Sequence, residues 1–167
     1  FSALWNDYVS ITPSALRIHK LLAGEENSPQ IVNDHVAFRT FALDKPRLSH
    51  LAEHFLALGY EAKGDYDFKA KKVTAQHFEH PDPTVPKVFI SELRVNEFSA
   101  ETQRIIHALV EQMPASVVEA ENFLYSGRHW QLSTQEYQSL ISESEYAGWL
   151  AAWGFRANHF TVSVNHL

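Results

Sequence analysis

Polar and apolar residues are interleaved along residues 33–41, which read Asn-Asp-His-Val-Ala-Phe-Arg-Thr-Phe and include β-branched and aromatic residues. Successive side chains of a strand point to opposite faces, so this pattern predicts a β-strand with Val36 and Phe38 on its apolar side. His35 and Arg39 then share the other side. A strand at the surface with two solvated polar side chains is the alternative interpretation.

Apolar residues with helical spacing precede this strand, and a series of predicted strands and one helix follows it. Residues 2–9 and the segment after Thr12 are expected to be helical, with Thr12 as N-cap and Pro13 at the first helical position. The following series predicts a β-α-β-β-β module. Its members are a strand at 33–41, a helix at 46–58 capped by Asp44, and strands at 60–67, 72–79 and 87–95.

Residues 99–113 return to a helical period with Ser99 as N-cap, and residues 134–153 predict one or two more helices with Thr134 as a start signal. Aromatic side chains gather near the end of this region, including Trp149 and Trp153. We expect them to form an ordinary helical core, because large aromatic side chains are usually buried. A lid over a cavity is the alternative interpretation.

A faint internal repeat closes the sequence. Asn158-His159-Phe160-Thr161-Val162 resembles the stretch around His35, since each has a polar residue, a histidine and then a β-rich run. We therefore predict one α+β domain over 1–167 built on paired β-α-β-β-β modules, with the second module truncated. Its parts are a helical lead-in at 1–30, the first module at 31–98, a helical insertion at 99–155 and the start of the second module at 156–167.

Composition narrows the class of function. The 167 residues carry a net charge of -6, which disfavours a nucleic-acid partner because such partners need a basic face. The sequence contains no run of apolar residues long enough to span a membrane. The absence of cysteine excludes disulfides and thiolate ligands and is consistent with a reducing, cytoplasmic location. The oligomeric state cannot be inferred from these features.

The histidines provide the candidate chemistry. If the two repeats are equivalent, His35 and His159 converge on one metal ion, and a carboxylate would complete a two-histidine site for Fe(II) or Zn²⁺. Glu92 is a candidate third ligand, although pairing with a nearby arginine is the alternative. His77 is a candidate for the second shell of ligands, and the Arg39 guanidinium suits a carboxylate.

His50 and His54 also have the spacing of a helical metal pair. No glutamate stands beside His50 as it does in zinc proteases. A solvated helix face is therefore the preferred interpretation.

Several motifs, in order along nearly the whole chain, resemble the 2-oxoadipate dioxygenase/decarboxylase family, whose fold is similar to that of vicinal oxygen chelate enzymes. The motifs are Trp5-Asn6-Asp7-Tyr8, Ile11-Thr12-Pro13, the 35–41 strand, Gly64-Asp65-Tyr66-Asp67-Phe68, His77-Phe78-Glu79-His80-Pro81, Ser91-Glu92-Leu93 and Asn158-His159-Phe160-Thr161.

This resemblance implies an Fe(II) site with His35 and His159 as ligands and Arg39 holding a substrate carboxylate. The family's third ligand, a glutamate late in the second module, lies beyond residue 167, so we expect the sequence to be part of a longer protein. Ligation by Glu92 or water is the alternative. The implied partners are O2 and a small 2-oxo acid, and the implied reaction converts 2-oxoadipate to 2-hydroxyglutarate and CO2 in lysine breakdown.

Two other classes of function remain open from the sequence. One is a non-oxidative metal-dependent lyase, isomerase or hydrolase on the same scaffold, using Zn²⁺ or another divalent metal. The other is a catalytically inactive binding module. The presence of His35, Arg39 and His159 argues against the inactive module, because buried polar groups without a task are costly.

Overall fold

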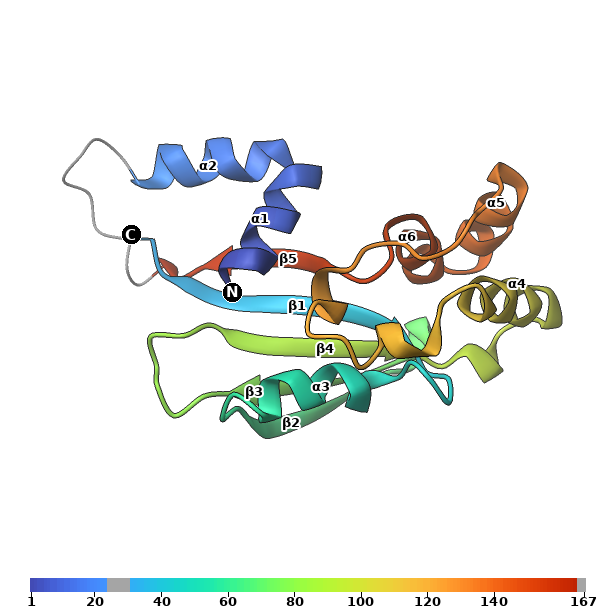
Figure 1. Ribbon diagram of the computed structural model, residues 1–167, viewed down its shortest axis with the longest axis horizontal. Coiled ribbons are helices and arrows are strands. Elements are labelled where there is room, and N and C mark those ends of the chain that lie inside the picture. The colour runs from blue at the N-terminus through green and yellow to red at the C-terminus, as the bar shows by residue number, and fades with distance from the viewer. Residues whose placement is uncertain (24–30, 165–167) are drawn as a thin grey trace.

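The computed structural model describes residues 1–23 and 31–164, which form a curved five-stranded sheet with helices at its sides and at one end (Figure 1). The strands are β1 (Asn33–Phe41), β2 (Glu61–Phe68), β3 (Val73–Glu79), β4 (Lys87–Leu93) and β5 (Ala157–Val162). The α-helices are α1 (Ser2–Ile11), α2 (Pro13–Ala23), α3 (Leu48–Leu56), α4 (Ala100–Glu111), α5 (Thr134–Glu143) and α6 (Glu145–Trp153).

The predicted β-α-β-β-β module is confirmed as β1-α3-β2-β3-β4. The sheet order is β2-β3-β4-β1-β5, and β1 runs parallel to β4 while the other neighbours are antiparallel. A parallel pair needs a long crossover, which α3 and the β2–β3 hairpin supply. β5 extends the sheet beyond β1, and the remainder of a second module stays a prediction.

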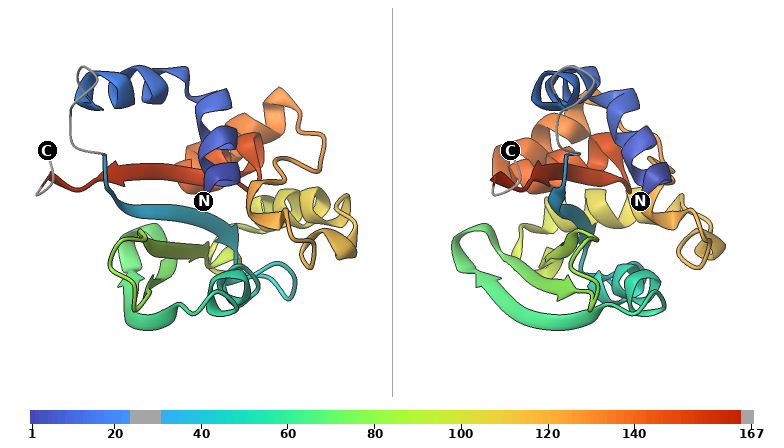
Figure 2. Two further views of the ribbon diagram at one scale, coloured as in Figure 1. Left: turned by 60° about the vertical axis from the view of Figure 1, so that its left-hand side comes forward. Right: turned by 90° about the vertical axis from the view of Figure 1, so that its left-hand side faces the viewer.

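The two faces of the sheet differ as the alternation of β1 predicts. Val36 and Phe38 are fully buried and belong to the core, where Phe38 contacts Phe55 of α3 with ring centroids 5.4 Å apart. Phe160 of β5 is the register partner of Val36 and packs against Trp5 of α1. In the right-hand view of Figure 2, α1 and α3 accordingly lie on one side of the sheet, and the β2–β3 hairpin curls toward the other.

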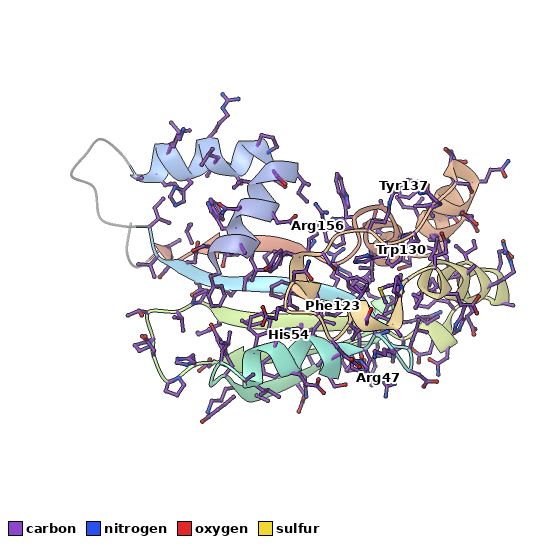
Figure 3. The ribbon with its side chains drawn as sticks, in the orientation of Figure 1. Arg47, His54, Phe123, Trp130, Tyr137 and Arg156 are labelled. Carbon is purple, nitrogen blue, oxygen red and sulfur yellow. The ribbon has the colours of Figure 1, made fainter. Side chains whose placement is uncertain are left out.

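The segment between β4 and β5 is largely helical, as predicted, and its aromatic side chains belong mainly to the core, except that Trp153, predicted to be buried, is exposed. Phe123 lies between two elements, with its ring centroid 4.6 Å from that of Phe155 and 6.1 Å from the His54 ring on α3 (Figure 3). Trp130 is buried, and its indole N–H donates to the carbonyl of Ala151 in α6 over 2.8 Å.

One local prediction needs correction, and parts of two others fall outside the described residues. α3 begins at Leu48 rather than at 46, and its N-terminal N–H groups are bound by Glu92 and His50 rather than by Asp44. The stretch 134–153 forms two helices, which is one of the two predicted outcomes, and they meet at Ser144, which caps α6 by accepting a hydrogen bond from the Ala147 N–H. The ends of the lead-in (24–30) and of the start of the second module (165–167) lie outside the described residues.

None of the helices formed by residues 1–23 and 31–164 has the length and apolar character needed to cross a bilayer.

A glycine makes the connection from α6 to β5. Gly154 has φ +72°, a conformation that side chains disfavour, and a Cβ atom built on it would lie 2.3 Å from the carbonyl oxygen of Gly127. Gly127 and Phe155 exchange two backbone hydrogen bonds of 2.9 Å at this point. The close approach fixes where β5 starts and therefore the register of His159 against β1.

We predict that Gly154→Ala destabilises the protein by at least about 2 kcal/mol, because backbone strain and the contact with Gly127 add together. Urea unfolding of the two proteins measures this difference. A loss below about 0.5 kcal/mol, the range of ordinary surface substitutions, would contradict this account of the turn.

Candidate metal centre and carboxylate site

His35 and His159 meet on the face of the sheet opposite α3. His159 lies on β5 beside Ala37 of β1, and its Nε2 atom is 3.3 Å from the Nε2 atom of His35. Two nitrogens that each bind one ion at about 2.1 Å, at angles between square and tetrahedral, are about 3.0–3.4 Å apart. The spacing of the two imidazoles therefore fits a shared metal ion.

The other ring nitrogen of each histidine contacts the residue that directly precedes it. His35 Nδ1 lies 2.8 Å from a carboxylate oxygen of Asp34, and His159 Nδ1 lies 3.0 Å from the amide oxygen of Asn158. A carboxylate and an amide oxygen accept the Nδ1–H, so the lone pair of each imidazole resides on Nε2. Two lone pairs that point at one another need a cation between them, and metal-bound histidines are typically oriented in this way.

The polar residue that precedes the histidine in each copy of the repeat therefore orients the histidine ring. Strand alternation would direct Asp34 and Asn158 to the opposite face, and this is why sequence reasoning did not select them. Thr161 was missed as well. Its hydroxyl lies 2.9 Å from His35 Nδ1 and accepts a hydrogen bond of 3.1 Å from the His35 backbone N–H, and this contact connects β5 to β1 at the site.

Burial favours the neutral form of His159. It lowers the pKa of the imidazole, and the nearby charges of His35 and Arg39 lower it further. Because only a deprotonated ring nitrogen can bind a metal, the lowered pKa matches the requirement of a ligand.

Arg39 lies on the same face of β1 and is half-buried. Burial lowers the pKa of its guanidinium, yet arginine remains charged because its ordinary pKa lies far above neutral pH. In the part of the chain that the structure describes, no carboxylate lies within ion-pair distance of Arg39. Arg39 borders a pocket of about 420 Å³, whose charged lining also includes Lys71 and Lys72 together with Glu143 and Glu145. A charged guanidinium without a carboxylate partner among the described residues can bind the carboxylate of a ligand.

The structure does not bring Glu92 to this site. Its register partner on β1 is Thr40, so Glu92 points to the face opposite His35 and Arg39, toward α3. Its carboxylate accepts a hydrogen bond of 2.8 Å from the Leu48 N–H at the start of α3. The prediction of Glu92 as a metal ligand is wrong for this reason. Across residues 1–23 and 31–164, the structure contains no group of three or more His, Asp or Glu side chains placed to hold a metal ion.

His77 lies on the same face of the sheet as His35 and His159 without touching either. Phe89 of β4 lies between them, with its ring centroid 5.3 Å from the ring of His77 and 5.2 Å from that of His35. The His77 nitrogens contact the Tyr66 hydroxyl at 2.9 Å and Glu79 at 3.3 Å. His77 is therefore separated from His35 by one aromatic ring, and its role as a second-shell residue stays a prediction.

His50 and His54 do not form a pair of ligands. His50 accepts a hydrogen bond of 3.1 Å from the Arg47 N–H, and His54 packs against Phe123. Both are half-buried rather than fully solvated.

The placement of Glu92 can be tested by substitution. We expect Glu92→Ala to lower the free energy of unfolding by about 1 kcal/mol because α3 loses an N-terminal acceptor, and Glu92→Gln to retain most of it. Urea unfolding measures both, and both variants should bind Zn²⁺ like the parent in a titration. Loss of Zn²⁺ binding in Glu92→Gln at unchanged stability would restore Glu92 as a ligand.

Comparison with known proteins identifies the family. The model of the 2-oxoadipate dioxygenase/decarboxylase family matches residues 7–167. The chloroplastic 2-oxoadipate dioxygenase/decarboxylase of Arabidopsis thaliana is 32% identical over 96% of this chain. This chain therefore belongs to the 2-oxoadipate dioxygenase/decarboxylase family, a family of enzymes whose reaction implies a metal cofactor.

Solved structures agree in fold. A Shewanella frigidimarina protein described as a hydrolase is 56% identical with a TM-score of 0.95, over 100% of this chain and 65% of its own. The hydroxyglutarate synthase of Oryza sativa, crystallised with 2-oxoadipate, is 32% identical with a TM-score of 0.88, over 99% of this chain and 57% of its own. The chain spans about half the length of the curated relatives it matches, 46% in the Arabidopsis enzyme.

Proposed function

We propose that this chain carries two metal ligands and the substrate arginine of an Fe(II)-dependent dioxygenase that converts 2-oxoadipate and O2 to 2-hydroxyglutarate and CO2. The observation that carries the proposal is the pair of Nε2 atoms 3.3 Å apart on the same sheet face as an arginine with no acidic partner among the described residues. Membership of the family and the relative crystallised with 2-oxoadipate support the same reaction.

In this proposal His35 and His159 hold the ion through Nε2. Bound Fe(II) would supply electrophilic polarisation of the 2-oxo acid and activation of O2. Asp34 and Asn158 hold the two rings in the tautomer that binds metal. A third carboxylate ligand would come from the part of the family fold that follows β5.

Arg39 would bind the carboxylate at the far end of the substrate. His35 and Arg39 are four residues apart on one strand, so their Cα atoms are about 13 Å apart. Side chains of this length converge on a molecule of six carbons placed between them. Holding both ends of the substrate fixes its orientation, which is a principal contribution of a protein to such a reaction.

The first test is oxygen uptake by the full-length protein, loaded anaerobically with Fe(II), on addition of 2-oxoadipate. We expect stoichiometric CO2 and 2-hydroxyglutarate, identified by mass. His35→Ala and His159→Ala should each reduce uptake by more than about 100-fold, because loss of a ligand exceeds the effect of losing a residue that merely orients one. His107→Ala, on the exposed side of α4, is the matched control and should retain activity.

A non-oxidative reaction is the second candidate, favoured by the Shewanella frigidimarina relative described as a hydrolase. Metal-dependent turnover without oxygen uptake, supported by Zn²⁺, would replace the dioxygenase by a lyase, isomerase or hydrolase. Bound metal with no turnover of any 2-oxo acid would contradict the dioxygenase proposal.

The orienting role of the two preceding residues has a separate readout. Asp34→Ala and Asn158→Ala should each weaken Zn²⁺ binding by about 10–100-fold, because the ring orientation and basicity of the ligand are lost. Competition with a chromophoric chelator measures the affinity. Asn96→Ala, at an exposed position away from the site, is the control, and equal affinity in all three variants would refute this role.

A further inference from the structure

Helix α6 presents two aromatic rings to Arg39. The guanidinium carbon lies 4.8 Å from the centroid of the Tyr146 ring and 5.0 Å from that of the Trp149 ring, with the cation over each ring. The two residues are three positions apart and so share one side of the helix. Aromatic faces attract a cation without neutralising it. The guanidinium is therefore held in place while its charge stays free for a ligand.

The position of Tyr146 is fixed from the strands that carry the site. Its hydroxyl lies 2.9 Å from the Ser91 hydroxyl and 2.9 Å from the Ser91 carbonyl oxygen, and it accepts a hydrogen bond of 3.2 Å from the Thr40 N–H. Ser91 is the register partner of Arg39 on β4, and Thr40 is its neighbour in the chain. One phenol thus joins α6 to both strands at the level of Arg39.

The rest of α6 is equally well anchored. Ala147, Leu150 and Ala151 are fully buried, and the Trp130 indole binds the Ala151 carbonyl. Trp149 lies on the same anchored helix and packs against the same core, so its position is also fixed. The two rings therefore occupy defined positions around Arg39.

We propose that Tyr146 and Trp149 are positioning residues that hold the Arg39 guanidinium for the distal carboxylate, and that they thereby set a preference for 2-oxo dicarboxylic acids over 2-oxo monocarboxylic acids. This inference rests on the proposed function. An acidic partner would also hold the arginine, but it would compete with the substrate carboxylate for the same N–H groups. Two rings avoid that competition.

The test compares two substrates of equal length in the full-length Fe(II) enzyme. 2-Oxoadipate carries the distal carboxylate and 2-oxohexanoate lacks it. Trp149→Leu should raise KM for 2-oxoadipate about tenfold, between the effects of an exposed and a fully desolvated cation–π contact, with kcat nearly unchanged. KM for 2-oxohexanoate should stay within about twofold, and Trp149→Phe should restore most of the preference because a ring remains.

Trp153→Leu is the matched control, since Trp153 lies on the same helix and is 42% exposed. It should leave both KM values unchanged. Equal losses for the two substrates in Trp149→Leu would assign Trp149 a structural role only and overturn the inference. An unchanged KM for 2-oxoadipate would overturn it too.

Equilibrium binding separates this inference from the proposed function. Calorimetry of the protein without added metal measures the affinity for both acids even if no turnover occurs. A preference for 2-oxoadipate in the parent that is lost in Trp149→Leu supports the inference, although absent oxygen uptake would refute the dioxygenase. No preference in the parent protein would refute the inference while active turnover left the proposed function intact.

Discussion

The pairing of β5 with β1 is the constraint on which the site depends. β1 supplies His35 and Arg39 to one face, and β5 is the strand that brings His159 beside Ala37. The register is irregular between Ala37 and Phe38, where the pairing skips a residue of β5. A shift of one residue would turn His159 to the buried face, because side chains alternate along a strand. The backbone pairing of β5 with β1 therefore decides whether His159 lies beside His35.

The apolar face of the sheet maintains that register. Val36, Phe38 and Phe160 are covered by α1 and α3, and their burial would be lost if either strand slipped. The opposite face carries the two histidines of the site and Arg39, which would be costly to bury without partners in the apolar core. Glu92 lies on the buried side of the sheet, and its carboxylate therefore accepts a hydrogen bond from the N-terminus of α3 and does not reach the two histidines.

Sequence reasoning predicted the parts of this arrangement that depend on local period. The alternation in β1 gave the two faces, and the repeated histidine gave the partner of His35. It failed where the answer depended on which side of the sheet a helix occupies, as for Glu92, because alternation defines two faces without saying which is covered. It also failed where a side chain turns back on its own neighbour, as Asp34 does. Trp149 was assigned only to a core, since nothing local connects it with a strand more than 100 residues earlier.

The 124 positions between His35 and His159 have a consequence for the order in which the molecule is built. Closing so long a loop costs conformational entropy, and contacts of this separation form late in folding. The β1-α3-β2-β3-β4 unit and the helices after it can acquire structure from nearer neighbours, whereas the imidazole pair exists only when nearly the whole described chain is in place. An ion bound by both rings would connect the first and last strands, as a covalent cross-link does. Its binding would therefore stabilise the folded state relative to the unfolded ensemble.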